Sequence, residues 1–150
     1  MKILAPLAEE GKINSEASIR DSQSTIINAP IQEVWEILAD IENWPTWNPD
    51  IKSVTCETFE VGESFKWNLQ GSHITSTIRK IQQPEILSWT GTAMGIKAIH
   101  VWHLDESDGQ TIVSTHESVQ GLLTIFMGHQ KLHNTLLNWL SRLKQKAERK

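Results

Sequence analysis

Two residues of this sequence, His100 and Glu117, have the side-chain types and the placement that acid–base chemistry requires. Each lies in a stretch of alternating residues that predicts a β-strand, on the strand face that we assign to the interior. A partly buried imidazole beside a carboxylate can donate or accept a proton near neutral pH. Buried charges tend to pair, because burying one alone is costly. Three roles stay open for this pair: catalysis, hydrogen bonding to a ligand oxygen, or the pairing of buried polar groups.

The other chemically reactive side chains form no recognisable site. His100 and His103 are three residues apart on a strand, so they point to opposite faces and cannot chelate one metal ion. His129 and His133 could share a helix face, but the sequence offers no third ligand. Serine-hydrolase and nucleotide-binding glycine motifs are absent, and the single cysteine, Cys56, excludes an intrachain disulfide. We therefore expect neither a metal nor a cofactor.

Apolar side chains between the predicted sheet and a C-terminal helix indicate a ligand cavity. Trp67, Trp89 and Trp102 offer flat faces for stacking, and Ser76 and Thr115 add a few polar atoms. If the space is hollow, it suits a flat or branched apolar ligand with a few oxygen atoms; if it is filled, it is an ordinary core. The candidate ligand-binding residues are Phe65, Trp67, Leu69, Ile74, Ser76, Ile78, Leu87, Trp89, Trp102, Val113, Thr115, Leu122, Phe126, Leu136 and Leu140.

The elements that must position these residues follow from periodicity and turn signals. A first strand over 17–27 leads into two short helices, over 31–38 and 41–46. The region 51–120 alternates and is punctuated by glycine, proline and aspartate, which predicts antiparallel strands joined by short turns. Apolar residues then recur every three or four positions over 121–148, which predicts one long helix, with Gly128 inside it. The clearest strands are expected at 64–69, 73–81, 86–93, 96–105 and 111–119.

The composition bounds the protein class. A chain of 150 residues fits one domain, which we place at 17–150, with residues 1–16 as a loosely held arm. A net charge of −4 argues against nucleic-acid binding, which depends on clustered cations. The sequence has no apolar run of roughly 20 residues, so we expect no membrane span. The N-terminus is not typical of a signal peptide, and we therefore expect a cytoplasmic protein.

Several separated motifs resemble one known superfamily. The run INAPIQEVWEILADIENWPTWNP, residues 27–49, is similar to the opening of the polyketide cyclase/dehydrase and lipid-transport family. That family belongs to the START-like, birch-pollen-allergen-like helix-grip superfamily. The likeness continues at 100–104, 109–113 and 117–121 and covers about residues 17–148. It implies an α+β helix-grip fold, with a curved antiparallel seven-stranded sheet wrapped round a long C-terminal helix and two short helices after the first strand.

The superfamily shares a cavity and not a chemistry, so the fold leaves several functions open. We expect first the binding of a small hydrophobic molecule, such as a lipid, a polyketide or another aromatic compound, between the sheet and the C-terminal helix. The alternative is a cyclase or dehydratase in which His100 acts as the base and Glu117 orients it. A second alternative is a protein-interaction module resembling the co-chaperone branch. Edge strands can pair between copies, so a homodimer is a further possibility.

Overall fold

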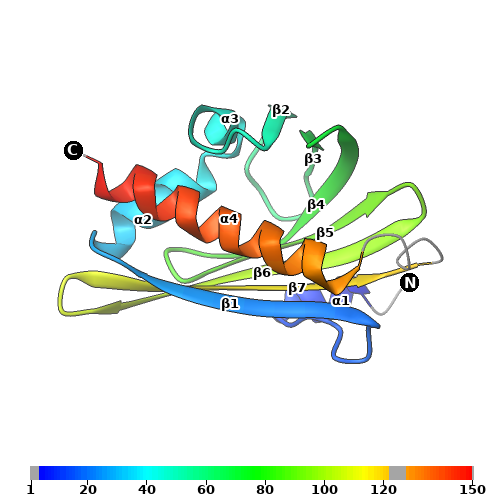
Figure 1. Cartoon of the computed structure of the whole chain (residues 1–150), viewed down its shortest axis with the longest axis horizontal. Helices are drawn as coiled ribbons and strands as arrows, with labels where there is room; N and C mark the ends of the chain where they lie inside the picture. The colour runs from blue at the N-terminus through cyan, green and yellow to red at the C-terminus, as the bar shows by residue number, and fades with distance from the viewer. Residues whose placement is uncertain (1–3, 122–127, 150) are drawn as a thin grey trace.

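The computed structural model describes residues 4–121 and 128–149. Within them, seven strands form one curved antiparallel sheet, and the C-terminal helix lies across its concave face (Figure 1). The strand order is β1-β7-β6-β5-β4-β3-β2. The predicted curved sheet, long terminal helix and short helices after the first strand are confirmed. The elements are α1 (Leu4–Glu9), β1 (Ile19–Ile27), α2 (Ile31–Ala39), the 3-10 turn η1 (Ile41–Asn43), α3 (Trp44–Trp47), β2 (Ile51–Thr55), β3 (Ser64–Leu69), β4 (Ser72–Gln82), β5 (Ile86–Ala93), β6 (Ile96–Ser107), β7 (Gln110–Gln120) and α4 (His129–Glu148).

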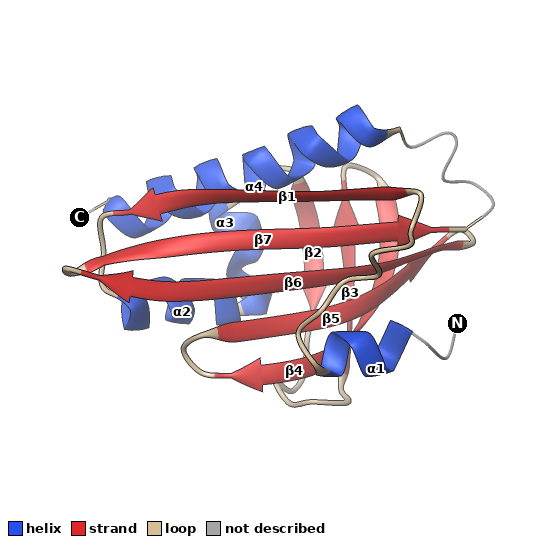
Figure 2. Ribbon diagram, turned by 90° about the horizontal axis from the view of Figure 1, so that it is seen from below, coloured by secondary structure: helices blue, strands red, loops and turns tan. Residues whose placement is uncertain are grey.

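The terminal helix α4 is held by one apolar stripe. Leu132, Leu136, Leu140 and Leu143, at spacings of three and four, are buried together with Trp139 between the helix and the sheet. The opposite face of α4 carries polar and charged residues. The helix contacts β1 along its length and α2 near its C-terminal end, so it closes the concave side of the sheet (Figure 2).

The start of α4 differs from the prediction of a helix over 121–148. The helix begins at His129, and Gly128 precedes it with a backbone φ of 77°. A right-handed helix does not accommodate that φ, so Gly128 marks the beginning of the helix and does not loosen its middle. The apolar positions that suggested the longer helix, Leu122 and Phe126 among them, lie outside the described residues.

Aromatic side chains fill the half of the concave side that faces α2 and α3. Trp44 lies at the centre of this cluster, and its ring centroid is between 5.0 and 5.6 Å from those of Phe65, Trp67, Trp89 and Trp139. Its indole N–H donates to the Leu38 carbonyl oxygen over 2.9 Å. This packing anchors the short helices to the sheet. It places the bulky aromatic side chains in this half of the concave side, so fewer of them remain to fill the other half.

The N-terminal segment lies on the outer, convex face of the sheet, opposite α4. Leu4 and Ala8 of α1 are buried against Ile99 and Val101 of β6. The Ser88 hydroxyl donates to the Ala8 carbonyl oxygen over 2.6 Å. Although we expected a loosely held arm over 1–16, the structure places a short helix there and packs its apolar side on the sheet (Figure 2).

Candidate functional site

A row of small side chains across three strands, followed by a valine on a fourth, creates a cavity on the concave face. Ser76 on β4 pairs with Gly91 on β5, Gly91 pairs with Ala98 on β6, and Ala98 pairs with Val119 on β7. Because little side-chain volume rises from this row, the end of the sheet near the start of α4 is hollow. The resulting cavity has a volume of about 410 Å³.

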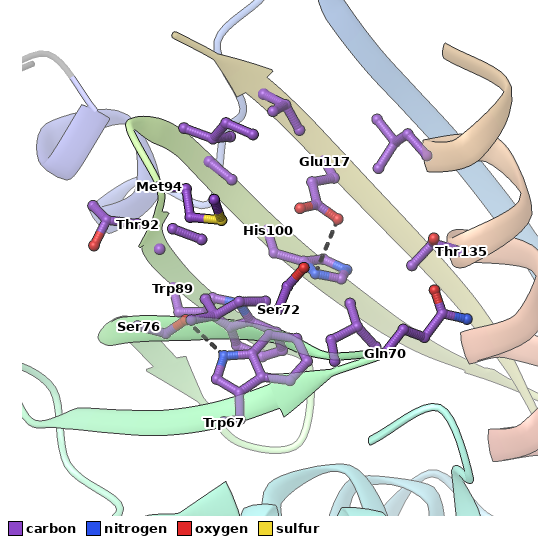
Figure 3. A pocket seen from close by; sticks show the side chains of 18 of the residues that line it. Trp67, Gln70, Ser72, Ser76, Trp89, Thr92, Met94, His100, Glu117 and Thr135 are labelled. Carbon is purple, nitrogen blue, oxygen red and sulfur yellow. Dashed lines mark hydrogen bonds and ion pairs between the residues drawn. The ribbon is translucent and has the colours of Figure 1, made fainter. Parts of the chain in front are cut away.

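The walls of the cavity come from both the sheet and α4. Trp67 and Trp89 form one side, and Thr135 of α4 lies on another (Figure 3). Leu132 and Trp139 of α4 also line the cavity. Exposed residues of the β3–β4 and β5–β6 turns form the mouth. The lining residues are Trp67, Leu69, Gln70, Ser72, Ile74, Ser76, Trp89, Gly91, Thr92, Ala93, Met94, Ile96, Ala98, His100, Glu117, Val119, Lys131, Leu132, Thr135 and Trp139.

Two hydrogen-bonded side chains fix the Trp67 wall. The indole N–H of Trp67 donates to the Ser76 hydroxyl over 3.0 Å, and both side chains are buried. Trp67 also contacts the rings of Trp89 and Trp139, with centroids 6.5 and 6.1 Å away. The wall is therefore held in one orientation and presents a preformed apolar surface.

His100 and Glu117 meet at the inner wall, in the row next to the small side chains. They are directly opposite each other on β6 and β7, with 3.4 Å between His100 Nδ1 and Glu117 Oε1 (Figure 3). His100 Nε2 lies 2.7 Å from the Thr115 hydroxyl, and the ring stacks on Trp102 at a centroid distance of 5.3 Å. Backbone pairing therefore holds the imidazole and the carboxyl at the same depth in the cavity.

Burial shifts the pKa values of His100 and Glu117 in opposite directions. Loss of hydration disfavours each charged form, so it lowers the pKa of His100 to about 3 and raises the pKa of Glu117 to about 8. Both side chains are thus uncharged near neutral pH. A neutral carboxyl can donate a hydrogen bond, and a carboxyl with a pKa near 8 can also transfer a proton.

A second polar cluster lies beside the cavity, between β1 and α4. Asp21 is opposite Glu117 in the sheet, and its carboxylate lies 3.0 Å from His133 Nδ1. The Gln23 amide also donates to Asp21, over 3.1 Å. His129 turns away and lies 3.1 Å from the Arg20 carbonyl oxygen. Within the described part of the chain, no group of three or more histidine, cysteine, aspartate or glutamate side chains is placed to hold a metal ion.

The family described as "Polyketide cyclase / dehydrase and lipid transport" matches residues 18–145, which is most of the chain. The protein belongs to this family. A search of curated proteins found no match. Among the described residues, no helix combines the length and the apolar character needed to cross a membrane.

Solved structures agree on the fold of this family member. A START superfamily protein from Mycobacterium smegmatis has 16% identity and a TM-score of 0.75, covering 86% of this chain and 97% of its own. A hypothetical protein, jhp0584, from Helicobacter pylori has 17% identity and a TM-score of 0.78, with coverages of 89% and 90%. Ara h 8.0201 has 14% identity and a TM-score of 0.69, with coverages of 85% and 96%. At such identities the likeness shows the helix-grip fold and nothing finer.

The structure separates the residues predicted for the site into two groups. Those that line the cavity are Trp67, Leu69, Ile74, Ser76, Trp89, His100 and Glu117. Those that do not line it are Phe65, Ile78, Leu87, Trp102, Val113, Thr115, Leu136 and Leu140, which are buried in the core. Leu122 and Phe126 lie outside the described residues. Both groups share the concave side of the sheet and α4, but the aromatic cluster fills much of that side and leaves this cavity at one end.

Sequence reasoning missed the mouth and the helix wall of the cavity. Met94 is 78% exposed at the β5–β6 turn, and Gln70 and Ser72 lie at the β3–β4 turn. On α4, Lys131 and Thr135 line the cavity, spaced four residues apart. The helical spacing from Lys131 to Trp139 was a usable signal for the helix wall. The turn residues gave none, because turns are usually outside the packed interior.

Proposed function

We propose that this protein binds a small hydrophobic molecule, such as a lipid, a polyketide or another aromatic compound, in the cavity between the sheet and α4. The observation that carries the proposal is the cavity itself, about 410 Å³ in volume, beside a cluster of buried aromatic and aliphatic side chains. That volume is within the usual range for small-molecule sites, roughly 300–1,000 Å³.

The chemistry of the walls supports an apolar ligand with few oxygen atoms. Trp67, Trp89 and Trp139 offer aromatic faces, and Leu69, Ile74 and other aliphatic side chains form much of the remaining surface. Burial of apolar ligand surface against such walls supplies the main driving force for binding. The polar side chains of the lining, with His100 and Glu117 at the inner wall, would fix the ligand's orientation.

Native mass spectrometry of protein purified without organic solvent tests the proposal. A retained ligand would add mass that disappears under denaturing conditions, and extraction would identify it. Protein without a bound ligand is then titrated with fatty acids and fused-ring aromatic ketones while thermal unfolding is recorded. A ligand that binds only the native state raises the melting temperature with its concentration. The proposal is wrong if the native mass equals the chain mass and no compound shifts the transition.

The second candidate function is a cyclase or dehydratase reaction in the same cavity. The observation that favours it is Glu117, a cavity-lining carboxyl whose pKa burial raises to about 8. Both ring nitrogens of His100 face protein atoms, so we now assign proton transfer to Glu117 and orientation to His100. With the extracted ligand or its precursor as substrate, Glu117→Gln would abolish turnover without unfolding the protein. Unchanged turnover would remove this candidate.

The remaining sequence-based hypotheses stay predictions. They are a co-chaperone-like interaction module, a homodimer, a cytoplasmic location and the lack of nucleic-acid binding. Light scattering on a size-exclusion column would decide the oligomeric state, and a pull-down that returns no stoichiometric protein would argue against the interaction module.

A further inference from the structure

The hydrogen bond between Thr115 and His100 determines which imidazole nitrogen carries the proton. The Thr115 side chain is fully buried, and its hydroxyl lies 2.7 Å from His100 Nε2. Among the described residues this hydroxyl has no other hydrogen-bond partner, and a buried donor without an acceptor is costly. The hydroxyl therefore donates to Nε2, which leaves the proton of the neutral ring on Nδ1. Nδ1–H in turn faces Glu117 Oε1, 3.4 Å away.

This arrangement uses one oxygen of the Glu117 carboxyl and leaves the other free for a ligand. Oε2 makes no hydrogen bond to any residue that the structure describes, and Figure 3 shows it pointing away from His100. The side chain lines the cavity and is 16% exposed. A neutral carboxyl in this position has its O–H available inside the cavity, where an unpaired donor is unfavourable until a ligand accepts from it.

Charge is unevenly distributed between the inner wall and the mouth. Among the described residues that line the cavity, Lys131 alone carries a permanent positive charge, and it is exposed at the first turn of α4. The inner wall instead holds Glu117, with Asp21 opposite it in the sheet. An anionic group at the inner wall would lose its hydration and lie near the Asp21 carboxylate, whereas at the mouth it would keep water and gain a cation.

Building on the proposed function, we propose that the natural ligand places an uncharged acceptor oxygen, such as a ketone or aldehyde carbonyl, against the Glu117 carboxyl. Any negative charge on the ligand lies at the mouth beside Lys131. The ligand class is therefore an apolar carbonyl compound that enters with its neutral end first. A molecule whose only polar group is a buried carboxylate is excluded.

The protonation state of Glu117 agrees with this assignment. Burial raises its pKa to about 8, so the carboxyl is mostly protonated below that pH. The titratable groups around it are His100 on β6, Asp21 on β1, and His133 and Lys131 on α4. His133 Nδ1 is already bound to Asp21, so it is not directed at Glu117.

Three matched naphthalenes test the inference: 2-acetylnaphthalene, 2-ethylnaphthalene and 2-naphthoate. They share one ring system and present a ketone, a hydrocarbon and a carboxylate. Calorimetric titration at pH 6.5 should show the ketone binding at least about tenfold tighter than the carboxylate. This comparison needs only the wild-type protein, so it does not depend on the folding of any variant.

Two substitutions then locate the effect at Glu117. Glu117→Leu should weaken the ketone about fivefold, the value of one hydrogen bond, and leave the hydrocarbon nearly unchanged. Glu117→Gln, which keeps an N–H donor of similar shape, should recover most of the loss. Circular dichroism and thermal unfolding check that both variants fold.

Each outcome decides the inference. Tighter binding of the carboxylate than of the ketone overturns it, and so does an equal effect of Glu117→Leu on the ketone and the hydrocarbon. If none of the three compounds binds, the inference is also overturned. The proposed function is tested separately, by native mass spectrometry. It is still supported if the protein retains a hydrophobic molecule that has no carbonyl group.

Discussion

Gly91 lies directly opposite Ser76 in the sheet, and a Cβ atom added to Gly91 would come within 3.0 Å of the Ser76 Oγ atom. Ser76 is not free to move aside, because its hydroxyl accepts the Trp67 indole N–H. The same added atom would be 3.4 Å from Ile74, another lining residue. The space above Gly91 is therefore part of the cavity, and the absence of a side chain at this position helps to keep it open.

Gly91→Val should close part of the cavity and block ligand binding. The valine side chain would occupy ligand space, so affinity for any cavity ligand should fall at least about tenfold. Crowding against Ser76 should lower the free energy of unfolding by about 1–3 kcal/mol. Calorimetric titration and urea unfolding measure the two effects.

Thr75→Val is the matched control for that substitution. Thr75 is exposed on the neighbouring strand and lies outside the cavity lining, so its change to valine should alter neither affinity nor folding appreciably. If Gly91→Val binds ligand as the wild type does, the ligand site is not at this row of small residues.

Glu117 should make the protein less stable as the pH rises above 6.5. In the folded protein the pKa of Glu117 is raised from 4.5 to about 8, so the folded state keeps a proton that the unfolded chain releases. This stabilisation is complete below pH 4.5 and is lost as the pH rises through 8. The free energy of unfolding should decline by up to about 1.4 kcal/mol per pH unit over this range. Urea unfolding between pH 6.5 and 8.5 measures the decline.

His100 has the opposite effect, at lower pH. Burial lowers its pKa from 6.5 to about 3, so between these pH values the unfolded chain binds a proton that the folded protein does not bind. Stability is lost as the pH falls from 6.5 towards 3, and the two effects oppose each other between 4.5 and 6.5. His116, whose pKa burial also lowers, contributes below 6.5. The effect of Glu117 on the free energy of unfolding is therefore measured above pH 6.5, where the two histidines do not oppose it.

Glu117→Gln should flatten the stability profile above pH 6.5, because it removes the titrating carboxyl and keeps its shape. The variant keeps every other titratable group, including His100 and Asp21. Any slope of the free energy of unfolding against pH that persists therefore comes from groups other than Glu117. A wild-type profile without a decline between 6.5 and 8.5 would show that Glu117 is already ionised at neutral pH.

The sequence could predict the sheet because its strands carry local signals. Alternation along 96–105 and 111–119 puts His100 and Glu117 on one face, and short turns fix the antiparallel pairing. The cavity has no such local signal. Its position depends on the two strand registers that align Ser76, Gly91 and Ala98, and on where α4 crosses these strands. These are long-range relationships, so the sequence suggested a set of inward residues and could not separate the cavity lining from the filled core.

The beginning of α4 illustrates a second limit. Helical periodicity continues through the sequence on both sides of Gly128, and glycine is compatible with a helix at a modest cost. The backbone φ of 77° that starts the helix at His129 is a conformation that glycine allows and does not require. Periodicity therefore overestimated the length of the helix.

Two buried tryptophans should respond differently to replacement by phenylalanine. Trp44 and Trp102 are both fully buried, but Trp44 donates its N–H to Leu38, whereas Trp102 Nε1 makes no hydrogen bond to a described residue. Trp44→Phe leaves a buried carbonyl without its donor, and Trp102→Phe removes an unpaired donor. The first should cost about 1–3 kcal/mol more than the second in urea unfolding. An equal cost would mean that the Trp102 N–H has a partner in solution.

The N-terminal helix should stabilise the sheet without influencing the cavity. Leu4 is 5% exposed and packs with Ala8 against Ile99 and Val101, on the face of the sheet opposite α4. Leu4→Ala should lower the free energy of unfolding by about 2–3 kcal/mol through the loss of this packing. Ligand affinity should not change, because the sheet separates α1 from the cavity. Glu9→Ala, at an exposed position of the same helix, is the control and should stay within about 0.5 kcal/mol of the wild type. A Leu4→Ala protein as stable as the control would show that α1 does not pack on the sheet in solution.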